Sequence, residues 1–214
     1  MESRLAGRVL LIGDVHAEDE RLGALLRWSE GRVDHRLCVG DIADGAGDLE
    51  RTCSLLDAEG VLCVRGNHDR WALAGQMRQL PQASPLGPIA RRFLEGLPAT
   101  RRFDLASGGE LELVHGVGDD DMREFRPHDD LERLDGSAAR DLAWTVGGHT
   151  HTFMCRAVGA GHFVNPGTLR HRGGRPSCFA VLEPERARLE RWIWVHGEPV
   201  LAWSRSLGLQ KADA

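Results

Sequence analysis

Short apolar runs recur along the chain, and each is followed closely by glycine and by a polar residue of a ligand-binding type. The first run, residues 9–12, leads to Asp14, and the second run, residues 37–39, leads to Asp41. Short apolar runs bounded by glycine are typical of buried β-strands. Three later runs follow the same pattern: 61–64, 111–114 and 144–146. The pattern predicts five strands with polar side chains at their carboxyl ends.

Two segments between the first three runs have the periodicity of helices. Residues 18–29 place Leu22, Leu25 and Leu26 on one face, and residues 48–58 repeat the arrangement with three leucines. Strands that alternate with helices predict βαβ units and a largely parallel sheet. In such sheets ligands bind outside the carboxyl ends of the strands. The polar residues fall at those ends, so we expect them to meet in one site.

The second half of the chain has the pattern of hairpins. Strand-like segments flank three turn signals, at residues 107–109, 159–161 and 183–185. We expect a second, more antiparallel sheet packed on the first, with helices outside. No repeat or linker divides the chain. We therefore expect a single domain over residues 1–204, and a frayed tail over residues 205–214.

Composition narrows the function classes. The chain has 214 residues, with 27 basic and 32 acidic side chains and a net charge of −5. An acidic chain is poorly suited to tracking a nucleic-acid backbone, so we expect no nucleic-acid partner. The five cysteines are odd in number and form no CxxC pair, which favours a reducing, cytoplasmic setting. The apolar stretch near the N-terminus is too short for a membrane span, and we expect no membrane association.

The polar residues at the strand ends are of types that bind metals. Asp14 and His16 are two positions apart, as are His149 and His151, so each pair can reach one ion. Asp41, Asn67 and His115 add further oxygens and a nitrogen. Asp, His and Asn together suit a divalent transition metal such as Mn, Fe, Co, Ni or Zn. Seven ligands exceed the needs of one site but suit two adjacent ions that share a carboxylate.

Six short motifs, in order, give the chain a resemblance to a known family. They are GDVH (13–16), GDIAD (40–44), GNHD (66–69), VHG (114–116), GHTH (148–151) and NPGT (165–168). The first five resemble the motifs of the calcineurin-like metallophosphoesterases. The last resembles a motif of small bacterial members, the YfcE-like phosphodiesterases. The resemblance covers residues 8–170, most of the chain.

The resemblance implies an α/β fold, a four-layer αββα sandwich of two packed mixed sheets with outer helices. It also implies two metal ions, with manganese first and iron, zinc, cobalt or nickel as alternatives. One ion would be held by Asp14, His16 and His151, and the other by Asn67, His115 and His149. Asp41 would bridge them.

The same resemblance implies a mechanism, attack of a metal-bridging hydroxide on a phosphoester. His68 matches the family's catalytic histidine, which protonates the leaving oxygen. For Asp69 two interpretations stay open: it orients His68, or it caps the helix that begins near Arg70. A lone aspartate after a glycine is usually a turn or cap residue, and a lone histidine is usually a core residue.

Departures from the family pattern bear on the substrate. The arginine that protein phosphatases of the superfamily carry after the second aspartate of GDxxD is absent here, since Asp44 is followed by Gly45. A phosphate-binding arginine stays unassigned, with Arg70, Arg170 or another as candidates. The acidic run 119–121 is expected to be a solvated loop.

The expected partner is therefore a small-molecule phosphomonoester or phosphodiester. Two alternatives remain: a non-catalytic scaffold of the same fold that binds a protein, and a serine/threonine-type protein phosphatase. The presence of His68 in GNHD favours the enzyme, because members that lack this histidine are inert on many substrates. Specificity is expected to lie in residues 71–100 and 117–140.

Overall fold

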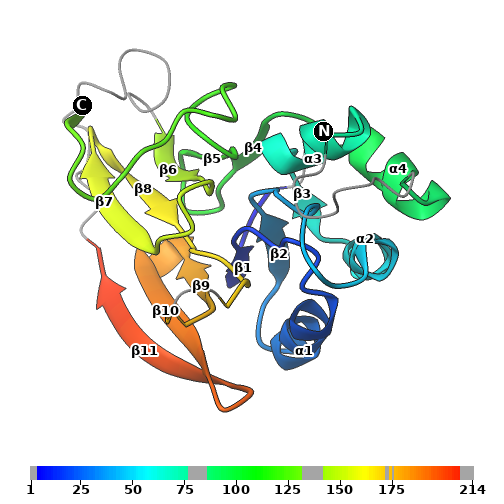
Figure 1. The fold of residues 1–214 in the computed structure, drawn as a ribbon. Helices are drawn as coiled ribbons and strands as arrows, with labels where there is room; N and C mark the ends of the chain where they lie inside the picture. Colours follow the sequence, from blue (N-terminus) through cyan, green and yellow to red (C-terminus); the bar gives the residue numbers. More distant parts are fainter. Residues whose placement is uncertain (1–3, 77–85, 132–141, 172–173, 175, 208–214) are drawn as a thin grey trace.

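Two β-sheets pack face to face and form the centre of the protein (Figure 1). The computed structural model describes residues 4–76, 86–131, 142–171, 174 and 176–207. The six-stranded sheet has the order β11-β10-β9-β1-β2-β3, and the five-stranded sheet has the order β4-β5-β6-β8-β7. Each sheet contains both parallel and antiparallel pairs, so both are mixed.

The six-stranded sheet combines the two ends of the chain. Its parallel half consists of β1 (Val9–Ile12), β2 (His35–Cys38) and β3 (Leu62–Cys63). Its antiparallel half consists of β9 (Cys178–Glu183), β10 (Arg188–Val195) and β11 (Glu198–Ser206). Strand β9 pairs antiparallel with β1 and so joins the halves.

The five-stranded sheet comes from the middle of the chain. Its strands are β4 (Arg101–Asp104), β5 (Glu110–Leu113), β6 (Leu142–Val146), β7 (Met154–Val158) and β8 (Gly161–Asn165). Strands β5, β6 and β8 run parallel, and the edge strands β4 and β7 run antiparallel to their neighbours. The carboxyl ends of β5 and β6 therefore point to the same edge.

The described α-helices cover the outer face of the six-stranded sheet (Figure 1). They are α1 (Asp19–Ser29), α2 (Leu49–Ala58), α3 (Asn67–Leu73) and α4 (Pro88–Glu95). Helix α2 begins after Asp48, whose side chain accepts a hydrogen bond from the backbone N–H of Arg51. The amides of Ile89 and Ala90 at the start of α4 donate to the carboxylate of Glu50, which suits the positive end of that helix.

Three apolar clusters hold the layers together. The first joins the helices to the six-stranded sheet and includes Leu22, Leu25, Leu56 and Leu94. The second lies between the two sheets, around Trp144. The third covers the outer face of the five-stranded sheet, where loop residues such as Phe125 pack on β7 and β8. Among the described residues, this loop takes the place of an outer helix on that side.

The predicted sandwich of two packed mixed sheets is confirmed, with differences in detail. The hairpin of β9 and β10 was expected in the second sheet, but it extends the first, because β9 pairs with β1. The expected tail begins too early, since β11 runs to Ser206 as a partner of β10. Residues 208–214 lie outside the described part.

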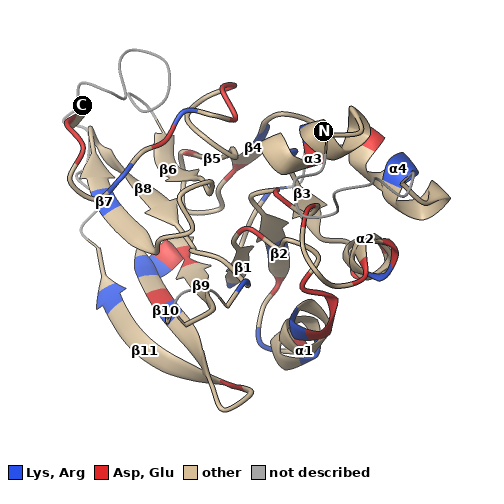
Figure 2. Ribbon diagram, viewed as in Figure 1, with Lys and Arg blue, Asp and Glu red and all other residues tan. Residues whose placement is uncertain are grey.

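Charges are mixed along the chain, with Arg interspersed among Asp and Glu on the helices and on β10 (Figure 2). In the described part of the chain, no helix has the length and apolar character needed to cross a membrane.

Helix α1 offers a test of the layer packing. A methyl group added at Gly23 would meet Leu55 Cδ1 at 3.6 Å and Arg27 Nη1 at 3.5 Å, which are ordinary contacts. We expect Gly23→Ala to raise the free energy of unfolding by about 0.5–1 kcal/mol, because alanine restricts the unfolded chain and favours helix. Urea denaturation measures the change. Lower stability in Gly23→Ala would mean that α1 and α2 pack more closely than described.

Candidate metal and active site

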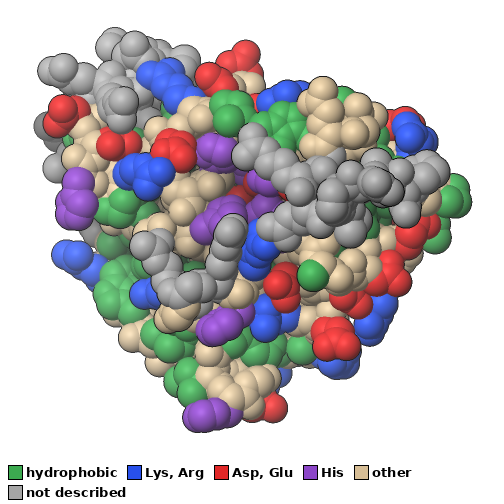
Figure 3. Space-filling view, in the orientation of Figure 1, with side chains coloured by type: hydrophobic (Ala, Val, Ile, Leu, Met, Phe, Trp, Pro, Cys, Tyr) green, Lys and Arg blue, Asp and Glu red, His purple; other side chains and the backbone are tan. Residues whose placement is uncertain are grey.

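The carboxyl ends of both sheets meet at one edge of the molecule and bring the predicted polar residues together. The ends of β1, β2 and β3 carry Asp14 and His16, Asp41 and Asn67. The ends of β5 and β6 carry the remaining three histidines. Figure 3 shows histidine side chains gathered in a hollow at the centre of the face drawn.

The seven side chains form two groups. In the first, ligand atoms of Asp14, His16, Asp41 and His151 all lie within 4.8 Å of one another. Nε2 of His16 is 3.0 Å from Nε2 of His151, and Nε2 of His151 is 3.7 Å from Oδ1 of Asp14. Nitrogen and carboxylate atoms facing one another at these distances form a compact donor set for one cation.

The second group shares one member with the first. Ligand atoms of Asp41, His115 and His149 again lie within 4.8 Å. Oδ1 of Asn67 lies 3.0 Å from Nε2 of His115 and 2.9 Å from Nδ1 of His149. Asp41 is thus common to both groups. Its Oδ1 is 3.4 Å from Nε2 of His115, and its Oδ2 is 3.9 Å from Nε2 of His16.

Burial of the Asp14 and Asp41 carboxylates costs free energy unless their negative charge is compensated. Asp14 and Asp41 are 0% and 1% exposed, and Oδ2 of each has no hydrogen-bond partner among the described residues. An unsatisfied buried carboxylate oxygen costs several kcal/mol. Both orphaned oxygens belong to the two ligand groups, and their chemistry suits a divalent cation. The residues present therefore fit a metal at each group.

The electrostatics of the protein alone point the same way. Burial opposes charge on Asp41, but the rings of His115, His16 and His68 hold the pKa of its carboxyl well below its ordinary value. Burial also opposes charge on His115, yet Asp41 and Asp14 raise its pKa to about 10. Burial lowers the pKa of His16 and of His149, which favours the neutral rings that bind metals. A proton on His115 thus supplies positive charge that a metal would replace.

Backbone contacts fix the orientation of two rings. Nδ1 of His16 lies 3.1 Å from the carbonyl oxygen of Ala43, and Nδ1 of His115 lies 2.8 Å from that of Val39. A carbonyl only accepts, so each Nδ1 donates, and the lone pair of a neutral ring is on Nε2, which faces its group.

Four of the ligand residues lie in the left-handed region of backbone space. They are His16 (φ 49°), Asp41 (φ 49°), His149 (φ 65°) and His151 (φ 55°). Such conformations are costly for residues other than glycine and concentrate at functional sites. The loops are held by hydrogen bonds from the N–H of His16 to the carbonyl of Asp41 and from the N–H of His149 to Oδ1 of Asp14.

Gly66 gives Asp41 its space. A methyl group added at Gly66 would overlap the carboxylate of Asp41. The N–H of His68, two residues on, donates to Oδ1 of Asp41 at 2.9 Å. The GNHD segment is therefore packed directly on the shared carboxylate.

The structure places Asp44, not Asp69, against the predicted catalytic histidine. Nδ1 of His68 lies 2.6 Å from Oδ2 of Asp44. Asp69 instead accepts hydrogen bonds from the backbone of Gly66, Ile42 and Ala43. Of the two interpretations left open for Asp69, these hydrogen bonds favour the cap, because its carboxylate accepts from the N–H of Gly66 just before α3, which begins at Asn67 and not near Arg70. The second aspartate of GDIAD is the sequence signal that could have identified Asp44.

The ring of His68 remains accessible from the hollow. Its side chain is 20% exposed, whereas that of Asp44 is 1% exposed. The ring of Trp71 packs edge-on against it, with centroids 4.8 Å apart. With Nδ1 held by Asp44, the ring is fixed from two sides. Its Nε2, 4.0 Å from Oδ2 of Asp41, faces the ligand groups.

The NPGT segment supports the site without joining it. The amide of Asn165 donates to the carbonyl of Gly148 at 2.6 Å, and the hydroxyl of Thr168 donates to the carbonyl of Asp14 at 2.8 Å. These bonds tie the loop after β8 to the loops after β6 and β1. No sequence pattern indicated this supporting role.

Histidines outside the motifs and the acidic run are not part of the ligand groups. His162 stacks on Trp144, and His35 accepts from the N–H of Ala6. In the acidic run, Asp121 forms an ion pair with Arg70. Neither of the two ligand groups includes a residue of this run.

Comparison with known proteins identifies the family and the fold. A model of the calcineurin-like phosphoesterase superfamily domain matches residues 8–187. No curated protein matches the chain significantly. Among solved structures, a metallophosphoesterase from Sphaerobacter thermophilus is 24% identical with a TM-score of 0.67, and 87% of each chain is covered.

Two further structures share the fold at lower identity. A hypothetical protein from Pyrococcus horikoshii OT3 is 14% identical with a TM-score of 0.69, and 86% of each chain is covered. Vps29 from Entamoeba histolytica, in complex with zinc, is 20% identical with a TM-score of 0.56. There, 91% of the present chain and 96% of Vps29 are covered.

The role of Asp69 can be tested by its effect on stability. We expect Asp69→Asn to lower the free energy of unfolding by about 1–3 kcal/mol, because an amide nitrogen cannot accept the hydrogen bonds of a carboxylate oxygen. Denaturant titration measures this loss. The matched control is Asp119→Asn, at an exposed position, which should change stability little. Equal stability of both variants would contradict the capping role.

Proposed function

Since the chain belongs to the calcineurin-like phosphoesterase superfamily, we propose that it is a metal-dependent hydrolase of small-molecule phosphomonoesters or phosphodiesters. The observation that carries the proposal is His68, held by Asp44 at 2.6 Å beside the shared carboxylate of Asp41. A protein that only bound metal would not need an oriented, accessible imidazole next to it. A histidine so placed suits proton transfer to a leaving oxygen.

In this proposal two divalent ions occupy the two ligand groups. Asp14, His16 and His151 would hold one ion and Asn67, His115 and His149 the other, while Asp41, common to both groups, would contribute to each. Manganese is the first choice, with iron, zinc, cobalt and nickel as alternatives, because oxygen and imidazole donors suit them all. When bound, the ions supply Lewis acidity and neutralise charge on the phosphoryl oxygens.

The chain's own residues orient the substrate and move the proton. The imidazole of His68 keeps its Nδ1 proton toward Asp44, so Nε2 is the atom that exchanges a proton with the leaving oxygen. Asp44 stabilises the imidazolium and fixes the ring, as a carboxylate behind a catalytic histidine commonly does. Asp69 acts indirectly by holding the Asp41 loop on the start of α3.

The second candidate is a non-catalytic scaffold that binds a protein. The structural likeness to Vps29 extends over almost its whole length, but at 20% identity it concerns the fold alone. The intact His68–Asp44 pair favours the enzyme. A protein phosphatase is disfavoured by Gly45 at the position of the superfamily's arginine, and a nucleic-acid substrate by the net charge of −5.

The cysteines support the proposed cytoplasmic setting. All five are free in the structure, and burial raises the pKa of four of them, Cys53, Cys63, Cys155 and Cys178. Buried, protonated thiols behave as small apolar side chains, as expected in a reducing compartment.

Turnover of matched substrates tests the proposal. Manganese-loaded protein should hydrolyse model phosphomonoesters or phosphodiesters with higher kcat/KM than phosphopeptides or single-stranded DNA. His68→Ala should lose about 100-fold to 10,000-fold on alkyl esters and much less on p-nitrophenyl esters, which need little protonation. Asp44→Asn should show the same dependence on the leaving group with a smaller loss.

Two results would contradict the proposal. Phosphopeptides or DNA preferred by a factor of about ten, or about 1.4 kcal/mol in transition-state binding, would exclude small molecules as the substrate class. Equal losses in His68→Ala across leaving groups of different pKa would show that His68 binds phosphate and does not donate a proton.

A further inference from the structure

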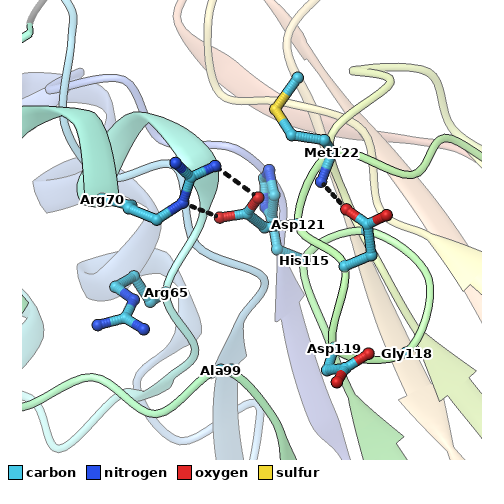
Figure 4. A pocket seen from close by; sticks show the side chains of 10 residues that line it. Arg65, Arg70, Ala99, His115, Gly118, Asp119, Asp121 and Met122 are labelled. Atoms are coloured by element: carbon cyan, nitrogen blue, oxygen red, sulfur yellow. Dashed lines mark hydrogen bonds and ion pairs between the residues drawn. The ribbon is translucent and has the colours of Figure 1, made fainter.

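A cavity of about 300 Å³ opens directly beside the ligand groups, and His115 is part of its lining. One wall consists of Arg65, in the segment that joins β3 to α3, and of Arg70, in α3 itself. The opposite wall is the loop of residues 116–122 that follows β5. Figure 4 shows the two arginines on one side and Asp119 and Met122 on the other. A phosphoester on the metal ligands would have this cavity next to it.

Arg70, one of the candidate phosphate-binding residues, already forms an ion pair within the protein. Its Nε and Nη2 each donate to the carboxylate of Asp121 at 2.8 Å, a bidentate pair (Figure 4). This hydrogen bonding raises the pKa of Arg70 and lowers the pKa of Asp121. The pair joins α3 to the loop and shapes the cavity. Arg70 would have to give up this partner in order to bind an anion.

Arg65 lines the same cavity, and its guanidinium has no partner among the described residues. Its backbone N–H donates to the carbonyl of Pro98 at 2.8 Å, so the main chain is fixed. The side chain is half-buried, and its guanidinium makes no hydrogen bond, ion pair or ring contact with any residue that the structure describes. Arg65 also stands two positions before Asn67, which fixes its place relative to the second ligand group.

A free guanidinium in a partly desolvated cavity has a defined chemical preference. Its planar donors match the oxygens of phosphate or carboxylate and bind them in bidentate fashion. The carboxylates on the opposite wall of the cavity do not pair with Arg65. Asp121 forms an ion pair with Arg70, and Asp120 accepts a hydrogen bond from the N–H of Met122. Asp119 is exposed, where water and salt screen its charge.

We propose that Arg65 binds a second anionic group, a phosphate or a carboxylate, carried by the organic part of the substrate. The inference rests on the proposed function, because the reacting phosphate must sit on the metal ligands for the second group to reach Arg65. It narrows the substrate class to phosphoesters with an additional anion. Simple alkyl or aryl phosphates would leave Arg65 without a partner.

Matched alkyl esters test the proposal. Butyl phosphate, butanediol bisphosphate and the phosphate ester of hydroxybutanoate have similar leaving groups, but only the last two carry a second anion. In the metal-loaded protein we expect kcat/KM for at least one ester with a second anionic group to exceed that for butyl phosphate by about 10-fold or more, as a charge-assisted bidentate contact provides. The ester with the larger gain identifies the group that Arg65 prefers.

Variants assign the gain to Arg65. The quantity compared is kcat/KM for the preferred ester with a second anion divided by kcat/KM for butyl phosphate. In Arg65→Gln this ratio should fall to about one. In Arg65→Lys part of the preference should remain, since lysine keeps the charge without the bidentate geometry. Arg27→Gln, an exposed change of the same charge on α1, should keep the full ratio. No preference in the wild type, or a preference that survives in Arg65→Gln, would overturn the proposal.

A binding measurement separates this proposal from the proposed function. Butane bisphosphonate and butyl phosphonate cannot be hydrolysed, so calorimetry reports their affinity whether or not the protein turns over. We expect tighter binding of the bisphosphonate in wild type and the loss of that preference in Arg65→Gln. Protein that binds in this way but hydrolyses no phosphoester would refute the proposed function alone. Protein that hydrolyses phosphoesters but binds both phosphonates equally would refute the role of Arg65 alone.

Discussion

The buried carboxylate of Asp41 is the constraint on which the rest of the site depends. It is 1% exposed, lies within reach of both ligand groups, and has one oxygen without a partner among the described residues. A charge so placed is tolerable only with strong compensation. His115 supplies part of it in the protein alone, and a cation on each side would supply the rest. The close packing of Gly66 on this carboxylate follows from the same need for space.

The ligand side chains come together because they lie at the edges of the two sheets. Parallel strands end at a common edge, so β1, β2 and β3 present their ligands together, as do β5 and β6. The two sheets pack on each other through the apolar cluster around Trp144, and this packing brings the two edges side by side. Residues in left-handed backbone conformations then orient the ligand side chains. The NPGT segment holds two of these loops by hydrogen bonds to their backbone carbonyls. A stable scaffold thus holds a costly site.

The ligand clusters could be predicted from the sequence because strand ends and motif order are local signals. Six of the seven predicted residues have their ligand atoms in the two compact groups, and Asn67 lies next to His115 and His149. Long-range pairing was harder to predict. No local pattern shows that β9 would pair with β1, or that the carboxylate of Asp69 would accept from three backbone amides and not from His68. Arg65 likewise has no partner among the described residues because the nearby carboxylate of Asp121 pairs with Arg70. Arg70 and Asp121 are far apart in the sequence, so no local pattern predicts this pair.

Metal binding to wild type and Asp41→Asn tests the central claim most directly. Metal-free protein would be titrated with manganese and followed by elemental analysis and electron paramagnetic resonance. The account predicts about two ions per wild-type chain with an exchange-coupled spectrum, as expected for adjacent ions that share a carboxylate. It predicts loss of most metal and of the coupling in Asp41→Asn, while Asp119→Asn behaves as wild type. Two coupled ions retained in Asp41→Asn would contradict it.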